Sequence, residues 1–399
     1  MKEAEIQVKT VSTPEDIEKL RPFWSELNLN PESDIDFVQI LAKARPEILG
    51  LHVLAAYEND KLVALLIGRI ENAVVTLKFG YWKLLNLRLK RVVFVREGFL
   101  GECSDRVAEA MVTHLVKSDR AVGRDVSLLC NVPVTGALNN AIKKHCPALR
   151  KGFSARVAER WRGRLPETYD AFMTARSRKH RGHLRRLFRI VEAEFPGQIR
   201  YENYTQPSQV NAFCEAADTI AQHTYQRGLN AGFIDNEENR RRLALAAEKG
   251  WFKGYIVFAQ DKPLAFWYGD LVKGVMHLGW TGYLPEYRDF ELGTILYLKM
   301  TEDLISLKAR ELDYGLGAAH YKERFGDICL QEVDTAIYSA NLKGWFCNVM
   351  LALEAVVNRV GARLLSKLKL KERMKKKWRS GLAETATSAA TEAKAEAEA

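Results

Sequence analysis

The chain has 399 residues, more than one hydrophobic core usually serves, and 47% of them are hydrophobic, so we expect two globular domains and a tail. The formal net charge of +10 favours anionic partners such as phosphorylated cofactors, nucleic acid or an anionic membrane surface, although the excess is concentrated in two segments. Six cysteines without metal-type or redox spacing predict reduced thiols in a cytosolic protein. Without an apolar signal core or a long apolar run, we expect neither secretion nor a membrane span.

The first 165 residues predict two helices, a strand meander, and then helices alternating with strands. Thr13 followed by Pro14 is typical of a helix start, and Glu15 and Asp16 add acidic side chains to the first turn. Residues 58–61 read as a turn between two strands. The expected helices are 14–28, 34–44, 105–117 and 136–145, and the expected strands are 52–57, 62–70, 74–79, 91–94, 126–130 and 155–164. No short motif in this half carries chemistry.

Leu165 and Pro166 mark the expected boundary, and the elements beyond it repeat the first half in outline. The expected helices are 168–194, 209–227, 236–249 and 291–309, and the expected strands are 198–204, 251–259, 264–270, 275–282, 311–315 and 333–339. We therefore expect one unit over 1–165 and a second over 166–341. A basic amphipathic helix over 342–379 and a disordered tail over 380–399 complete the expected organisation.

The second half contains a candidate anion site where a strand leads through a polar loop into a helix. The strand over 275–282 is interrupted by Pro285, and the helix begins near Leu292. Backbone N–H groups of a first helical turn have no partner within the helix, so they can bind an anion. Gly293 and Thr294 place a small residue and a hydroxyl at this turn.

Three motifs in this half resemble GNAT-superfamily acyltransferases of the cellulose- and exopolysaccharide-associated type, relatives of the Fem-type aminoacyl and peptidyl transferases. The resemblance covers roughly residues 165–340 and implies an α/β fold of two fused GNAT-like units. Each unit would be a mixed, mostly antiparallel sheet flanked by helices, with catalysis in the second. The motifs are Tyr283-Leu-Pro-Glu-Tyr-Arg288, Glu291-Leu-Gly-Thr294, and Asp313-Tyr-Gly-Leu-Gly317 followed by Tyr321-Lys322-Glu-Arg-Phe-Gly326.

Acyl transfer to an amine needs a base, donors for the oxyanion and an acid for the leaving thiolate, and it needs no metal. We expect Tyr321 and Lys322 to supply the acid and the acceptor contacts. Asp313 would be the base or the group that orients Lys322, and His277 a second base. The alternatives are an exposed Tyr-Lys pair at a helix start, a carboxylate that caps the Gly315 turn, and a structural histidine.

Five residues would line the acyl or pyrophosphate side of an acetyl-CoA or other acyl-CoA donor: Tyr283, Tyr287, Arg288, Gly293 and Thr294. Asp289 and Glu291 bring negative charge to the same loop, which suits the helix dipole but competes with a pyrophosphate. This departure from CoA-binding relatives leaves room for an aminoacyl-tRNA or another acyl thioester as the donor.

The predicted helix over 168–194 is strongly basic between residues 176 and 189. It is either a solvated face, a phosphate-binding face or an RNA-binding face that rests on phosphate contacts. Arginine-rich helices at this place adjoin the acceptor cleft in the resembled family. We therefore expect Arg181 and Arg185, together with Trp280, to bind the acceptor.

The helix over 342–370 carries an apolar stripe, and residues 367–379 are heavily cationic. The helix either docks on the folded domain or lays its basic end, residues 359–379, against anionic lipid.

Together these features predict a cytoplasmic N-acyltransferase, with a peripheral location on the inner face of the membrane as the alternative. The resemblance alone implies a bacterial protein of cell-envelope or exopolysaccharide metabolism. The acceptor would be an amino-sugar or amino-acid-like amine bound between the halves. The alternatives are a Fem-type transferase that uses aminoacyl-tRNA, and a non-catalytic GNAT-like binding protein at the membrane. The enzyme hypothesis depends on first-turn amides near Leu292 that face Tyr321 and Lys322 across a shared opening.

Overall fold

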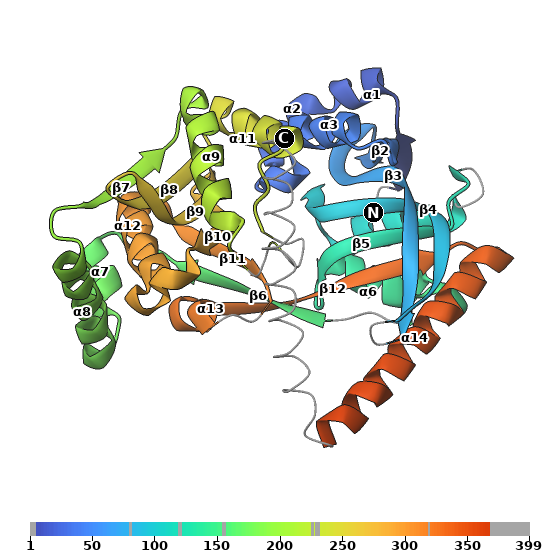
Figure 1. Ribbon diagram of the computed structural model, residues 1–399. Helices are drawn as coiled ribbons and strands as arrows, with labels where there is room; N and C mark the ends of the chain where they lie inside the picture. The colour runs from blue at the N-terminus through green and yellow to red at the C-terminus, as the bar shows by residue number, and fades with distance from the viewer. Residues whose placement is uncertain are drawn as a thin grey trace, which may run out of the picture. The chain divides into compact units, whose positions relative to one another are not determined.

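The computed structural model describes residues 5–79, 82–118, 122–153, 157–224, 227, 232–317 and 320–367. The chain divides into two compact units (Figure 1). The first comprises Met1–Arg160 and Leu330–Leu368, and the second is built on Trp161–Cys329. The expected tail and most of the cationic segment 367–379 lie outside the described residues.

The first unit is a mixed sheet in the strand order β1-β2-β3-β4-β5-β12, in which β4 and β5 are parallel and the other neighbours are antiparallel. Its strands are β1 (Ile6–Val11), β2 (Ile48–Glu58), β3 (Lys61–Phe79), β4 (Trp82–Gly101), β5 (Val126–Pro133) and β12 (Ile328–Tyr338). Its helices are α1 (Pro14–Lys19), α2 (Arg21–Leu27), η1 (Pro31–Ser33), α3 (Ile35–Ala44), α4 (Asp105–Lys117), α6 (Ala137–His145), η2 (Ala148–Arg150) and α14 (Leu342–Lys367).

The second unit repeats this plan in the order β6-β11-β10-β9-β8-β7. β10 and β11 are parallel, whereas β7 to β10 form an antiparallel meander. Its strands are β6 (Val157–Arg164), β7 (Ile199–Tyr204), β8 (Phe252–Ala259), β9 (Lys262–Val272), β10 (Val275–Tyr283) and β11 (Glu311–Leu316). Its helices are α7 (Tyr169–Thr174), α8 (Arg178–Glu194), η3 (Pro207–Gln209), α9 (Val210–Ala221), α11 (Glu237–Glu248), η4 (Pro285–Phe290), α12 (Leu292–Ser306) and α13 (His320–Phe325).

Helices α9 and α12 cover opposite faces of the second sheet. Phe213 of α9 makes perpendicular ring contacts with Phe252 and Phe266, at 5.4 and 6.3 Å between centroids. On the other face, Trp267 packs against Tyr297 of α12 at 5.9 Å. Since successive residues of a strand point to opposite faces, Phe266 and Trp267 report the two sides of β9. Burial of these large rings gives the unit a core of its own.

Two of the predicted helices are each broken in two. The first continues as α1 and α2 around Leu20, because Pro22 has no N–H to donate and takes a first-turn position in a new helix. The long basic helix is α7 followed by α8, and the Ser177 hydroxyl caps α8 by accepting from the His180 N–H. The cap predicted at Thr13 is confirmed, and the helix predicted from residue 34 has Asp34 as its N-cap.

The first sheet contains one long hairpin where the sequence predicted three short strands. Residues 62–70 and 74–79 belong to β3, residues 91–94 belong to β4, and these two strands pair from Ala64↔Gly101 to Phe79↔Trp82. The closing strand predicted over 333–339 is β12, which pairs with β5 in the first unit. Strand β1 and helices α13 and η4 are not among the predicted elements. Each unit is the mixed, mostly antiparallel sheet with flanking helices that was expected.

Candidate functional site

The parallel strands β10 and β11 of the second unit part in the middle of the sheet. They pair over Val275↔Glu311, Met276↔Leu312 and His277↔Asp313, and there the pairing ends. β10 continues to Tyr283 with a register irregularity after Leu278, and β11 continues to Leu316. Backbone groups beyond this pair are therefore released from the β10–β11 ladder.

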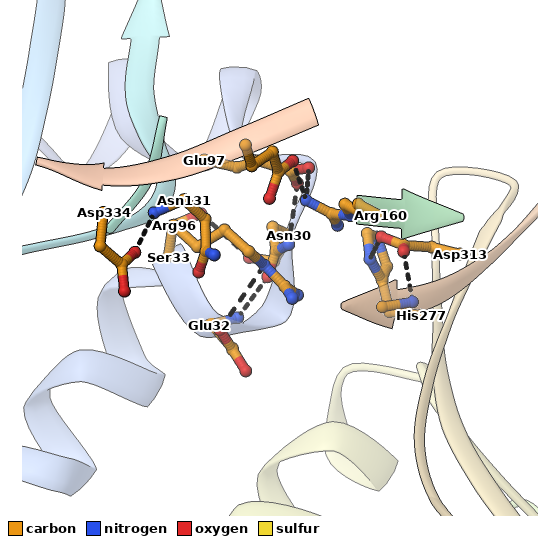
Figure 2. A network of polar contacts seen from close by, with 12 residues as sticks. Asn30, Glu32, Ser33, Arg96, Glu97, Asn131, Arg160, His277, Asp313 and Asp334 are labelled. Atoms are coloured by element: carbon orange, nitrogen blue, oxygen red, sulfur yellow. Dashed lines mark hydrogen bonds and ion pairs between the residues drawn. The ribbon is translucent and has the colours of Figure 1, made fainter. Parts of the chain in front are cut away.

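His277 and Asp313 lie side by side where the strands part (Figure 2). The Nδ1 atom of His277 is 3.4 Å from Oδ2 of Asp313, and both side chains are buried. The other carboxylate oxygen, Oδ1, accepts a hydrogen bond from the Gly315 N–H at 2.9 Å. Gly315 has a φ of +69°, which favours glycine at this turn. The carboxylate is thus held in place by the turn and directed at the imidazole.

Lys322, on the short helix α13, is buried beside the same carboxylate. Its Nζ donates to the Leu316 carbonyl oxygen at 2.5 Å. Burial lowers the pKa of the Lys322 ammonium, and the charge of Asp313 opposes that shift. Asp313 therefore interacts with both His277 and Lys322.

Trp267 links Tyr321 to the start of α12. Its ring meets the Tyr321 ring edge-on at 5.5 Å between centroids, and its Nε1 donates to the Gly293 carbonyl oxygen at 3.0 Å. An indole thus bridges Tyr321 and the first turn of α12, where the sequence hypothesis placed an open space. Tyr321 also contacts Tyr314 at 6.2 Å, so it belongs to the aromatic cluster beneath α12.

The N-terminus of α12 has no side-chain cap. Glu291 occupies the cap position in a left-handed conformation, φ 46° and ψ 41°. The Thr294 and Ile295 N–H groups donate to the Glu291 carbonyl oxygen, and within the described chain those of Leu292 and Gly293 have no backbone partner. A Cβ added to Gly293 would meet only the Tyr283 ring, at 4.0 Å. The Gly293 N–H is therefore approachable, whereas Leu292 is buried.

The corresponding helix of the first unit is closed. α4 also follows the strand that makes the parallel pair, but its cap residue is Ser104. The Ser104 Oγ accepts from the Val107 N–H at 3.4 Å and donates to the Glu102 carboxylate at 2.8 Å. The start of α4 is therefore capped by the Ser104 side chain, whereas the start of α12, the corresponding helix of the second unit, has no side-chain cap.

The Glu291 carboxylate at the start of α12 lies beside His183 and the guanidinium of Arg324. Its Oε1 is 3.1 Å from the His183 Nε2, and its Oε2 is 3.9 Å from Arg324. The Arg324 Nε donates to His180 at 2.6 Å. Burial and then the Arg324 charge lower the pKa of His180 to about 4. The negative charge of Glu291, which competes with an anionic donor, is thus partly compensated by Arg324.

The other residues predicted for the donor side have separate surroundings. Tyr283 is exposed beside Gly293, and Thr294 donates to the Glu291 carboxylate at 3.5 Å. Tyr287 instead packs against Phe195 at 6.0 Å and accepts from Lys262 at 3.4 Å, and Arg288 is exposed. Tyr283, Gly293 and Thr294 surround the helix start, whereas Tyr287 points to Lys262.

The three residues predicted for the acceptor do not form one group. Trp280 stacks on Tyr268 at 5.3 Å, on the α9 face of the sheet. Arg181 donates to the carbonyl oxygens of Thr174 and Arg176 after α7, and Arg185 is exposed on α8. Helix α8 packs near α12, across the sheet from Trp280.

Sequence reasoning missed Trp267, and it did not connect His183 and Arg324 with Glu291. Trp267 stands in the aromatic run Phe266-Trp-Tyr268, whose alternation along a strand is a signal that one ring faces each side of the sheet. No sequence signal joins His183 to Glu291, because their contact depends on how α8 packs. No cluster of three His, Cys, Asp or Glu side chains suited to a metal occurs among the described residues. Likewise, no helix within the described residues is both long and apolar enough to cross a bilayer.

Residues 178–323 match a protein-family model described as an acetyltransferase (GNAT) domain. Comparison with curated proteins finds no match. Among solved structures the chain is similar to FemX, at 11% identity and a TM-score of 0.52, over 82% of this chain and 96% of that one. Two further similar structures have TM-scores below 0.5. They are L-PGS from Bacillus licheniformis (14% identity, TM-score 0.46, 87% and 97% covered) and a tandem GNAT protein from the clavulanic acid biosynthesis pathway (9%, 0.44, 84% and 100%).

At these identities the structural likeness concerns the fold alone, whereas the family model concerns the segment that holds the parted strands and α12. The chain therefore has the predicted tandem GNAT-like α/β fold, and its residues 178–323 are similar to an acetyltransferase (GNAT) domain.

Proposed function

We propose that the protein is an N-acyltransferase that moves an acyl group from a CoA thioester to an amine, with the second unit as the catalytic one. The opening expected between the first-turn amides and Tyr321 is filled by Trp267, so the proposal does not rest on it. The observation that carries the proposal is the parting of β10 and β11 together with the uncapped start of α12. Unpaired strand edges and free amides at one place suit a ligand that combines an amide-bearing chain with a phosphate group. The family match over this segment supports the same chemistry.

In this proposal the Gly293 N–H binds the donor pyrophosphate, and Tyr283 lies over the same turn. Arg288, exposed on η4 and with no side-chain partner among the described residues, adds a cation to the loop. Helix N-termini favour phosphate because the backbone dipoles and the free N–H groups act together. Gly293 matters because a larger side chain would project from the turn that the phosphates approach.

His277, oriented by Asp313, acts as the general base that removes a proton from the acceptor amine. Lys322 or Tyr321 returns a proton to the leaving thiolate. Asp313 orients the imidazole, as the 3.4 Å contact and the Gly315 turn require. A thiol titrates at about 8.5, and the lowered pKa of Lys322 brings its ammonium closer to that value. Proton donation is most efficient when the two groups are matched in this way.

The acceptor is an amino-sugar or amino-acid-like amine of cell-envelope or exopolysaccharide metabolism. The sequence resemblance alone supports this choice, because a fold does not specify a substrate. Trp280 and the cation of Arg242, which lies 5.2 Å from the centroid of its indole ring, offer one surface for such a molecule.

The test is a thermal-shift titration of the full chain with acetyl-CoA, followed by thiol release with glucosamine or alanine as the acceptor. We expect a donor-dependent rise in Tm and acceptor-dependent release of CoA. Tyr321→Phe should lower turnover about 10²-fold if the hydroxyl is the acid. Tyr287→Phe is the control: it also removes one phenolic hydroxyl, here the one that accepts from Lys262, and it should leave turnover unchanged.

Turnover that is the same in both variants would remove Tyr321 from the mechanism and leave Lys322 as the acid. Absence of any response to acetyl-CoA would reject the CoA-dependent transferase. Binding of acetyl-CoA without CoA release by any amine would favour the alternative of a non-catalytic binding protein.

A second candidate is a transferase that uses aminoacyl-tRNA, and the surface of α8 is the observation that favours it. Five cations of α8 are exposed and make no side-chain ion pair with described residues: Arg178, Lys179, Arg185, Arg186 and Arg189. At about 100° per residue they occupy one side of the helix, opposite the buried Leu184, Leu187 and Val191. Such a face suits a phosphate backbone.

Binding of unfractionated tRNA to the full chain separates the two candidates. The tRNA hypothesis expects retention that weakens steeply with salt and is lost in Arg185→Gln/Arg186→Gln/Arg189→Gln. Arg241→Gln, on α11, is the control, because Arg241 is engaged with Glu237. Equal weak retention by all three proteins, with a clear response to acetyl-CoA, would reject the tRNA hypothesis.

A further inference from the structure

Helix α14 is fastened to the first unit along one side. Cys347, Met350 and Leu351 pack with the β3–β4 hairpin and Tyr338. The Asn348 side chain donates to the Lys151 carbonyl oxygen at 2.8 Å, and the Asn358 side chain donates to that of Lys78 at 3.1 Å. At about 100° per residue, Cys347, Met350, Leu351 and Asn358 fall on one side of the helix.

The opposite side of α14 is apolar and exposed. Six large side chains there have exposed fractions between 42% and 53%: Trp345, Phe346, Leu353, Val356, Val357 and Val360. By the same periodicity they fall within about 120° of the helix circumference, centred opposite the fastened side. Figure 1 shows α14 as the long red helix at the edge of the first unit. A contiguous exposed patch of this kind marks an interaction surface.

Charge identifies the partner that this surface fits. The only acidic residue in α14 is Glu354, and its carboxylate accepts from the Lys78 N–H at 3.2 Å on the fastened side. The exposed face therefore carries no carboxylate, while Arg359 beside it is exposed. The chain then continues through residues 367–379, KLKLKERMKKKWR, with eight Lys or Arg residues and one Glu.

We propose that α14 docks the protein on an anionic lipid surface, lying in the plane of the interface with its exposed apolar side among the acyl chains. Apolar side chains and juxtaposed cations are the two signals that stable peripheral attachment needs, and each is weak alone. A second copy of this chain could cover the apolar side, but it would bring the same cations and no complementary charge. The inference is independent of the proposed catalytic function, since it concerns the first unit.

Co-sedimentation of the full chain with lipid vesicles tests the proposal. We expect binding to vesicles of phosphatidylcholine mixed with phosphatidylglycerol, at least about tenfold weaker binding to phosphatidylcholine alone, and a decline with salt. Leu353→Glu/Val357→Glu should lower binding to the mixed vesicles at least about tenfold. Leu29→Glu/Leu49→Glu is the matched control, because these leucines of the first unit are 56% and 53% exposed and lie outside α14.

Circular dichroism melting shows whether each variant is folded, and Val356→Ser/Val360→Ser is a milder second variant that should show the same loss in smaller measure. The proposal is overturned if the wild-type chain ignores the mixed vesicles, or if both α14 variants bind them as tightly as the control does. It is also overturned if the wild-type chain is a lipid-independent dimer that the α14 variants dissociate, as measured by light scattering. That result would assign the face to a second copy.

Discussion

Glu291→Gln perturbs the proposed donor site at its most informative point. Glu291 caps α12 through its backbone, and its carboxylate lies 3.1 Å from His183 and 3.9 Å from Arg324. If the donor pyrophosphate binds at the first-turn amides, this carboxylate is a like charge next to it. Replacing the carboxylate by an amide keeps the side-chain shape, removes that repulsion, and frees the Arg324 guanidinium to face the phosphate.

The expected size follows from Coulomb's law. Two unit charges about 6 Å apart at an effective dielectric constant of about 40 repel by about 1.4 kcal/mol. That energy corresponds to about a tenfold lower KM for acetyl-CoA. Without ligand the variant should instead be slightly less stable, by about 0.3–1 kcal/mol, because an acidic side chain favours a helix N-terminus. Opposite signs for stability and donor binding distinguish the electrostatic effect from a general loosening.

Steady-state thiol release measures KM, and thermal melting measures stability. Glu302→Gln is the control, since it removes the same charge from the same helix, eleven residues further on and about 16 Å away. That distance exceeds the Debye length of about 8 Å at physiological ionic strength, so the control KM should not move. An unchanged or higher KM in Glu291→Gln, with stability altered as expected, would refute donor binding at this helix start.

Three further outcomes are expected. If Lys322 donates the proton, kcat should fall at alkaline pH with an apparent pKa below 10.5, because burial lowers the pKa of Lys322. Lys322→Met should abolish this alkaline limb of the pH–rate profile and lower turnover about 10²-fold. The same limb in the variant would contradict this role. Arg160→Met should destabilise the first unit by about 3–5 kcal/mol in urea melts, because buried Arg160 pairs with Glu97 at 2.6 Å (Figure 2) and Glu332 at 3.2 Å, and both carboxylates would lose that cation. A loss below about 1 kcal/mol would show that the pairing is dispensable. The folded-state pKa of His180, about 4, lies below its ordinary 6.5, so the unfolded chain binds more protons between these values and stability should fall as pH drops through them. His180→Asn should weaken that dependence, and parallel curves of Tm against pH for the two proteins would contradict the reasoning.

Short-range features of the fold can be predicted from the sequence, because the residues that form them are neighbours in the chain. The Thr13 cap accepts from Asp16 three residues later, and Asn59 and Asp60 take positive φ values in the predicted turn. Helix α4 has the predicted bounds, since its apolar spacing reports a single buried face. The break between α7 and α8 was missed because a continuous basic and apolar pattern concealed the Ser177 cap.

The residues of the candidate site can be predicted only in part from the sequence. The sequence singled out His277, Asp313 and Lys322, and the structure brings these three together because β10 and β11 pair in parallel at His277↔Asp313. Trp280 and Arg185 were grouped with each other on chemical type, but strand alternation places Trp280 on the α9 face. Trp267 escaped notice, because an indole within a strand looks like core until its Nε1 is seen to meet Gly293.

The sequence by itself determined most of the elements, the Thr13 cap, the two-unit α/β plan and the residues on which acyl-transfer chemistry could rest, since these depend on local spacing and side-chain type. Only the tertiary structure decided which unit receives β12 and α14, where the parallel strands part, and that Glu291 lies between His183 and Arg324. These features join residues that are far apart in the chain. Their positions follow from packing and pairing between elements, which no local pattern encodes.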